Sequence, residues 1–244
     1  MTTYRNIHGR AIQSLATDPT ESVSEGQIWY NTASDTFKSI VSSQAWSSSA
    51  SLNTARIQLS GALASPNTAS LAFGGDAPGV TGATEEYNGS GWSNGGSLST
   101  ARRLGAGAGT QTAALYFGGN PPASGATTTE EYGGASWTSG GALPVAKGGL
   151  AGCGLQTAAL AFGGSPPTRD TSEEYDGSSW TAGGSLSVAF EDAAGAGTQT
   201  AGLKFGGRGT PTQTTEKYDG SSWTTRGLMN TGRGYLGGAG LQTA

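Results

Sequence analysis

A repeat of about 44 residues runs through most of the chain and constrains its fold more than any other feature. The pattern Leu-X-Phe-Gly-Gly occurs at residues 71–75 and three more times, and its phenylalanines are 44, 45 and 43 residues apart. Each copy is followed by a tyrosine and, five residues later, by a tryptophan. These tryptophans are Trp92, Trp137, Trp180 and Trp223, with Trp46 as an earlier member of the series. A period of this length is typical of the blades of a β-propeller.

Each unit divides into four expected strands, which we call a to d. In the second unit, residues 103–109 form strand a, 113–117 strand b, 128–132 strand c, and Trp137 lies on strand d. Asp-Gly and Asn-Gly pairs between strands c and d favour tight hairpins, because a type I′ turn needs positive φ at both central residues. The sequence therefore predicts an all-β domain made of four-stranded antiparallel blades.

The two ends of the chain each carry part of one further unit. Residues 232–240 resemble strand a, and the segments that fit strands b, c and d are 27–30, 36–41 and 45–46. We therefore expect a five-bladed propeller that closes when the N-terminal strands b, c and d pair with the C-terminal strand a. Closure would leave no exposed sheet edge. The alternative is a larger ring, with further blades beyond residue 244.

This count predicts two parts in the chain. The propeller spans residues 26–244, and residues 1–25 form a short arm that is too small to bury a core of its own.

Composition excludes several kinds of chemistry. Cys153 and His8 are the only cysteine and histidine, so we expect no disulfide, no metal site and no cofactor. Adjacent glutamates such as Glu85 and Glu86 point to opposite faces of a strand, unlike the converging pair of a glycosidase. The formal net charge is −4, with no basic cluster beyond Arg102 and Arg103, which argues against nucleic acid. We therefore expect a protein that is not an enzyme.

No stretch approaches 18 consecutive apolar residues, so the sequence predicts no insertion into a membrane. Residues 1–18 also lack the apolar core of a secretory signal.

The order of Gly-Gly, Tyr and Trp in each unit resembles the kelch repeat over residues 55–244, with a shorter Tyr-to-Trp interval than usual. Residues 25–38 (EGQIWYNTASDTFK) resemble a module common in bacteriophage tail and fibre proteins, and units such as 106–115 resemble those of virion proteins from phages of aquatic bacteria. The resemblance implies a tail-associated virion protein, made in the host cytoplasm and present in many copies per particle.

Differences between the units point to one face of the propeller. The b–c loops and the starts of strand a vary, and both lie on the same face of a four-stranded blade. Loops held by a rigid scaffold commonly bind ligands, although neutral drift also diversifies loops. The candidate binding-face residues are Arg56, Arg102, Arg103, Lys147, Arg169, Phe190, Glu191, Asp192, Arg208, Arg233 and Tyr235.

The expected partners follow from the resemblance. The arm would dock on other tail proteins through Tyr4, Arg5, His8 and Arg10, and the propeller face would bind a host-surface receptor, with a glycan as one candidate. Two alternatives remain open: a purely architectural virion component that makes only protein contacts, and a cellular kelch-type interaction module.

Overall fold

The computed structural model describes residues 13–16, 28–39, 48–121, 125–166, 170–208 and 212–241. The chain divides into two compact units, Met1–Ser48 and Ser49–Ala244. Within the described residues, no helix is long and apolar enough to cross a membrane.

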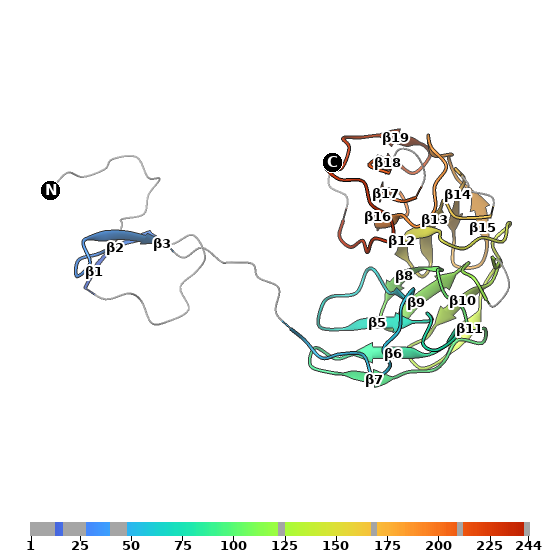
Figure 1. Ribbon diagram of the computed structural model, residues 1–244, viewed down its shortest axis with the longest axis horizontal. Helices are drawn as coiled ribbons and strands as arrows, with labels where there is room; N and C mark the ends of the chain where they lie inside the picture. The colour runs from blue at the N-terminus through green and yellow to red at the C-terminus, as the bar shows by residue number, and fades with distance from the viewer. Residues whose placement is uncertain are drawn as a thin grey trace. The chain divides into compact units, whose positions relative to one another are not determined.

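The N-terminal unit contains one three-stranded sheet, formed by β1 (Gln13–Leu15), β2 (Ile28–Asn31) and β3 (Thr36–Ser39) (Figure 1). The antiparallel β2–β3 pair matches the predicted strands b and c. Strand β1 was not expected, and it pairs with β2 in parallel, on the edge predicted for the C-terminal strand a. Strand β1 therefore adds a third strand to the sheet of the N-terminal unit.

The C-terminal unit contains four sheets of four antiparallel strands, consistent with a β-propeller. We call them blades 1 to 4, and within each blade the strands follow in chain order. Their bounds are β4 (Ser60–Gly61), β5 (Ser70–Phe73), β6 (Thr84–Tyr87) and β7 (Trp92–Asn94); β8 (Ala106–Thr110), β9 (Ala113–Phe117), β10 (Thr129–Tyr132) and β11 (Trp137–Ser139); β12 (Ala151–Leu155), β13 (Ala158–Phe162), β14 (Ser172–Tyr175) and β15 (Trp180–Ala182); β16 (Ala194–Thr198), β17 (Ala201–Phe205), β18 (Thr215–Tyr218) and β19 (Trp223–Thr225). The predicted four-stranded repeat is confirmed.

The first strands of successive blades lie side by side, which explains their glycine-rich sequences. A Cβ atom on Gly107 of β8 would lie 2.3 Å from the carbonyl oxygen of Gly61 in β4. Likewise, a Cβ atom on Gly195 of β16 would lie 2.4 Å from the carbonyl oxygen of Gly152 in β12. Backbones this close leave no room for side chains, so strand a must be built from glycine interleaved with small residues.

Larger side chains fill the space between neighbouring blades further out. The phenylalanine that ends strand b packs on the tryptophan of the next blade, with ring centroids 5.0 Å apart for Phe73 and Trp137 and 4.9 Å apart for Phe117 and Trp180. The indole N–H of Trp180 also donates to Thr129 Oγ1 at 3.0 Å. These contacts repeat from blade to blade, so the repeat sequence encodes the interfaces as well as the strands.

Polar contacts join the same blades. The hydroxyl of Tyr218 donates to Glu174 Oε1 of the preceding blade at 2.7 Å. In the a–b turn, Gln199 Nε2 donates to the carbonyl oxygens of Ala159 and Tyr175 at 3.1 and 2.7 Å. Gln, Tyr and Glu recur at the same spacing in successive repeats, and they form the same contacts at each interface between blades.

The last described segment continues this arrangement without forming a strand. The N–H of Gly197 donates to the carbonyl of Gly240 at 2.9 Å, as Ala64 does to Gly109 between blades 1 and 2. A Cβ atom on Gly238 would lie 2.3 Å from the carbonyl oxygen of Gly195. Residues 232–241 therefore lie beside β16 much as β16 lies beside β12. The described residues of the C-terminal unit form four complete blades.

Candidate axial site

Three of the predicted binding-face residues, Arg56, Arg102 and Lys147, are buried cations that stabilise the blades. Arg102 is fully buried, and its guanidinium lies 2.8 Å from Glu130 Oε1 and 2.7 Å from the carbonyl oxygen of Gly118. Arg56 and Lys147 are buried in the same way beside Glu85 and Glu173. Each cation lies four residues before the first strand of its blade and pairs with a glutamate on the third strand, so these pairs hold the blade together.

Blade 4 places its cation differently. Phe190 occupies the position of Arg102 and is 2% exposed, while Lys204 on β17 carries the charge and lies 4.4 Å from the centroid of the Phe190 ring. Burial lowers the pKa of Lys204, and nearby Glu216 opposes that change. The assignment of Arg56, Arg102, Lys147 and Phe190 to a binding face is therefore wrong, because their side chains lie in the interior.

Two residues after Arg56, Arg102, Lys147, Phe190 and Arg233, each repeat of the C-terminal unit has a residue with a left-handed backbone. These residues, which we call the axial rim, are Gln58, Leu104, Gly149, Asp192 and Tyr235, with φ angles of 56°, 56°, 62°, 56° and 57°. Consecutive members are joined by backbone hydrogen bonds. The N–H of Leu104 donates to Gln58, that of Gly149 to Leu104, that of Asp192 to Gly149 and that of Tyr235 to Asp192, at 3.1, 2.7, 2.7 and 2.8 Å. The rim is thus a chain of five equivalent residues, one from each unit.

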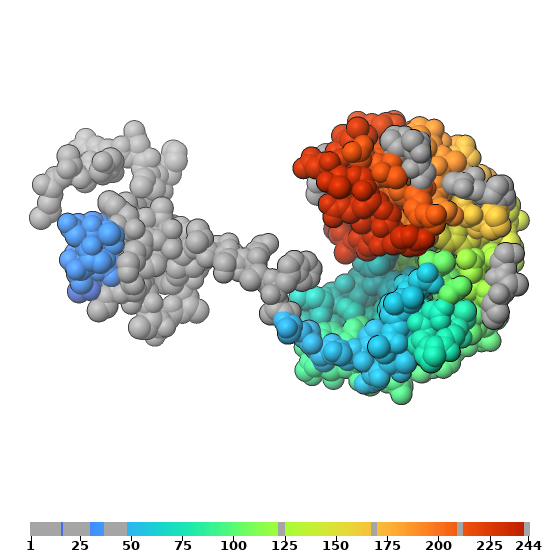
Figure 2. All heavy atoms as spheres, in the orientation of Figure 1, coloured from blue at the N-terminus to red at the C-terminus, as the bar shows by residue number. Residues whose placement is uncertain are grey.

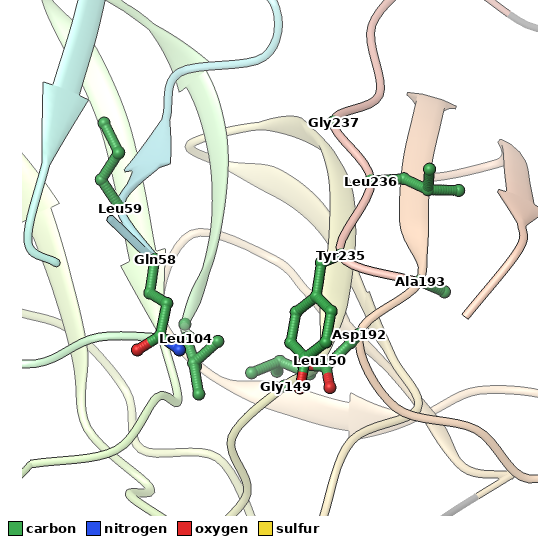
Figure 3. A pocket seen from close by; sticks show the side chains of 11 residues that line it. Gln58, Leu59, Leu104, Gly149, Leu150, Asp192, Ala193, Tyr235, Leu236 and Gly237 are labelled. Carbon is green, nitrogen blue, oxygen red and sulfur yellow. The ribbon is translucent and has the colours of Figure 1, made fainter. Parts of the chain in front are cut away.

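The rim surrounds a pocket of about 320 Å³. Its lining comes from all five units and combines the rim with the residues that follow it, among them Leu59, Leu150 and Leu236. Figure 3 shows Gln58 and Leu104 facing Tyr235 and Asp192 across the pocket. The pocket is concave, and its lining exposes polar and apolar surface in nearly equal measure, so it could hold a small ligand.

Charged groups that do not line the pocket lie next to two residues that do, Asp192 and Tyr235. Arg208, which is 55% exposed, donates to the hydroxyl of Tyr235 at 2.8 Å and lies 3.4 Å from Glu191 and 3.5 Å from Asp192. Burial and the nearby charge of Glu191 raise the pKa of Asp192, and Arg208 opposes this. On the opposite side, Gln58 Oε1 is buried and has no hydrogen-bond partner.

Arg103 and Arg233, which were also predicted for the binding face, do not line the pocket. The Arg103 side chain, 38% exposed, forms an ion pair with Asp76 of the b–c loop of blade 1. Arg233 is exposed, and its carbonyl oxygen accepts a hydrogen bond from Gly207 at 2.9 Å. Arg169 and the arm residues Tyr4, Arg5, His8 and Arg10 lie outside the described residues.

Sequence comparison of the units found Asp192 and Tyr235 but missed Gln58, Leu104 and Gly149. The missed residues look unlike their counterparts in size and polarity, so only their common position in the repeat could have identified them.

Other reactive groups lie away from the pocket. Cys153 is buried, its thiol donates to the carbonyl oxygen of Thr198 at 3.4 Å, and burial raises its pKa to about 12. A thiol with such a pKa remains protonated at neutral pH and is a poor nucleophile. In the described part of the chain, no group of three or more His, Cys, Asp or Glu residues is placed to hold a metal ion.

No protein-family model matches the chain, and no curated protein matches it significantly.

Proposed function

We propose that this protein is a recognition module without catalytic activity, whose propeller presents the axial rim to a ligand on a cell surface. The observation that carries the proposal is the rim itself. Five equivalent backbone positions have the same φ and are linked in series by backbone hydrogen bonds, yet they are occupied by five different residue types. A rigid scaffold that varies only its side chains at one opening is suited to binding.

The sequence resemblance gives this module a setting. We propose that it is a kelch-like structural protein of a bacteriophage virion, associated with the tail or fibre, and that the receptor is on the host surface. Residues 25–38, with their likeness to phage tail modules, support this setting. Many copies on one particle would multiply weak individual contacts into firm attachment.

Cell binding tests the proposal. Fluorescently labelled full-length chain would be incubated with a panel of aquatic bacteria, beside a variant carrying Gln58→Gly, Asp192→Asn and Tyr235→Ala. Leu155→Ala is the matched control, because Leu155 is 50% exposed in the a–b turn region, at the opposite end of strand a from the rim. We expect binding that the rim variant loses and the control retains. Binding to no strain, or equal binding by all three proteins, would contradict the proposal.

We also propose that the propeller has five blades, with strands b, c and d of the fifth supplied by residues 27–46. The edge of blade 4 supports an additional blade. Phe205 is partly exposed, whereas its counterparts Phe117 and Phe162 are fully buried under the tryptophan of the next blade. A cavity of about 550 Å³ lies beside Phe205, lined in part by Leu228, Met229 and Leu236.

Blade 1 has the matching deficit on its other edge. Tyr87 and Trp92 are partly exposed, whereas Tyr132 is fully buried and Trp137 is 9% exposed. A fifth blade would also need a tryptophan to cover Phe205 of blade 4. Trp46 fits this role, because it precedes Arg56 by ten residues, as Trp92 precedes Arg102.

Cysteine cross-linking tests this closure. In a Cys153→Ala background, cysteines at positions 46 and 205 should form a cross-link within one chain. A cross-link found only between chains would assign the fifth blade to a second copy, and the absence of any cross-link would overturn the closure.

A further inference from the structure

The same tyrosine–glutamate contact joins each neighbouring pair among the four described blades. The tyrosine that ends strand c donates its hydroxyl hydrogen to a glutamate on strand c of the preceding blade. In chain order, the pairs are Tyr132 with Glu86, Tyr175 with Glu131 and Tyr218 with Glu174. Each glutamate directly precedes the tyrosine of its own blade in the sequence. The contact is therefore part of the repeat and joins one blade to the next.

The tyrosine depends on this glutamate because its hydroxyl is buried among donors. Tyr175 is buried, and its hydroxyl oxygen accepts a hydrogen bond from the N–H of Gly141 at 3.3 Å. Burial and the hydrogen bond to Glu131 raise the pKa of Tyr175 to about 12, so the hydroxyl keeps its proton at neutral pH. A buried donor without an acceptor is costly, and Glu131 is the acceptor, at 2.5 Å.

Blade 4 departs from the repeat at this position. Lys217 directly precedes Tyr218 on β18 (Thr215–Tyr218) and takes the place of the glutamate. It is partly exposed on the edge that a following blade would cover. An ammonium group donates hydrogen bonds and accepts none. A tyrosine packed on this edge would therefore meet a donor where its proton needs an acceptor.

The rest of the edge keeps the repeat pattern. Thr84 and Thr129 accept hydrogen bonds from the tryptophan of the following blade, at 2.9 and 3.0 Å, and Thr215 has the same position in blade 4. Phe205 likewise corresponds to Phe73, which packs on such a tryptophan. The edge of blade 4 thus suits a strand pair that carries the tryptophan without the tyrosine.

Two segments could bring a tryptophan to this edge. One is residues 36–46 of the same chain, of which 40–46 lie outside the described residues. The other is blade 1 of a second copy, because the first copy's own blade 1 lies across an opening in the C-terminal unit (Figure 2, blade 1 in cyan and the last residues in red). Blade 1 carries Tyr87 five residues before Trp92, whereas Val41 stands five residues before Trp46. Valine has no hydroxyl to satisfy.

We infer that Lys217 determines which segment completes the edge of blade 4: it admits residues 36–46 of its own chain and disfavours blade 1 of a second copy. A repeat whose last blade kept the glutamate could join copies head to tail, and such contacts form open filaments when they do not close. Lys217 acts against that alternative partner. This inference rests on the proposed five-bladed closure and adds the residue that makes it selective.

A double-mutant cycle on the full chain tests the pairing of positions 41 and 217. Urea unfolding would be measured for the parent, Val41→Tyr, Lys217→Glu and the double variant. We expect Val41→Tyr to raise the unfolding equilibrium constant at least fivefold, and Lys217→Glu to reverse that loss, which gives a coupling of at least fivefold. The matched control is Tyr175→Val with Glu131→Lys, which places the valine–lysine pair in a described interface and should show a similar coupling.

Self-association tests the selectivity. Trp46→Ala removes the tryptophan of the competing segment, and sedimentation velocity would compare this variant with Trp46→Ala, Lys217→Glu. We expect the added glutamate to raise the association constant at least fivefold, and Tyr87→Val to remove the gain.

The inference is overturned if positions 41 and 217 show no coupling, or if Lys217→Glu leaves self-association unchanged. The cross-link between positions 46 and 205 separates these failures from a failure of the closure. If the cross-link forms within one chain but no coupling is found, the fifth blade stands and Lys217 does not select it. If no cross-link forms within one chain, the closure falls and the inference falls with it.

Discussion

The buried cations and the axial rim lie two residues apart in the same repeat, yet they obey opposite rules. At the first position, Arg102 makes an ion pair, three hydrogen bonds to carbonyl oxygens and a contact with the Tyr116 ring 4.5 Å away. At the second, the backbone is fixed and the side chain is free to differ. At the first position, a buried cation paired with a glutamate supports blades 1 to 3, and at the second position the residue type varies beside the pocket. The following predictions test this division, starting with the largest expected effect.

Removing a buried cation should destabilise the protein strongly. Arg102→Met leaves the Glu130 carboxylate buried without its partner, and such a loss costs about 3–5 kcal/mol. The control is Arg103→Met, which removes a partly exposed ion pair and should cost at most about 1 kcal/mol. Urea unfolding measures both. A loss below about 1 kcal/mol for Arg102→Met would show that the buried pair does not support the blade.

Ligand binding at the rim should weaken in acid. Because the pKa of Asp192 is raised by burial and by Glu191, its carboxylate becomes protonated at a higher pH than a free aspartate, whose pKa is 3.8. A hydrogen bond to a charged group contributes about 1.5–3 kcal/mol, so the affinity for a ligand that donates to Asp192 should fall by about tenfold or more as pH falls through this pKa. Calorimetry between about pH 7 and pH 4 would measure the change, and Asp192→Asn should abolish it.

The fold should survive these conditions. Protonation of Asp192 favours the folded state, since the folded pKa is the higher one. Asp176 and Asp219 contribute in the opposite sense. Backbone hydrogen bonds from their turns lower each pKa to about 2, so their contribution is present above pH 3.8 and is lost as pH falls toward 2. An affinity that does not change with pH would remove Asp192 from the site.

Adding a side chain to the one glycine of the rim should cost stability. Gly149→Ala places a Cβ atom at a φ of 62°, with Asp192 Oδ1 2.8 Å away, and we expect a loss of about 1–2 kcal/mol. Gly133→Ala is a useful control, because a Cβ atom there meets nothing within 4 Å and its φ is not positive. Equal stability of Gly149→Ala and the parent would mean that the rim is not strained.

Much of the fold could be predicted from the sequence because it repeats. Four occurrences of Phe-Gly-Gly, Tyr and Trp fix the strand order of each blade, and the glycine-rich composition of β8 predicts its place beside other backbones. The parallel strand β1 could not be predicted, since three residues without alternation carry no pattern. Its pairing depends on a tertiary contact with β2.

The site was harder to predict than the fold. Variation between repeats selected Asp192 and Tyr235, which line the pocket, but the same criterion selected Arg102 and Lys147, which are buried. Spacing does not reveal that a strand c glutamate lies beside each of these cations. Nor does it reveal that the chain turns left-handed two residues later, because Gln58 and Leu104 are not residues that favour this conformation.

The most direct test of the division between fold and pocket is the unfolding free energy of Gln58→Gly. If the glutamine is present for a ligand, glycine should relieve the backbone strain and stabilise the free protein by about 0.5–1 kcal/mol after its greater chain entropy is counted. If Gln58 instead supports the fold, the same substitution should destabilise the protein by more than about 1 kcal/mol, and that result would contradict the account.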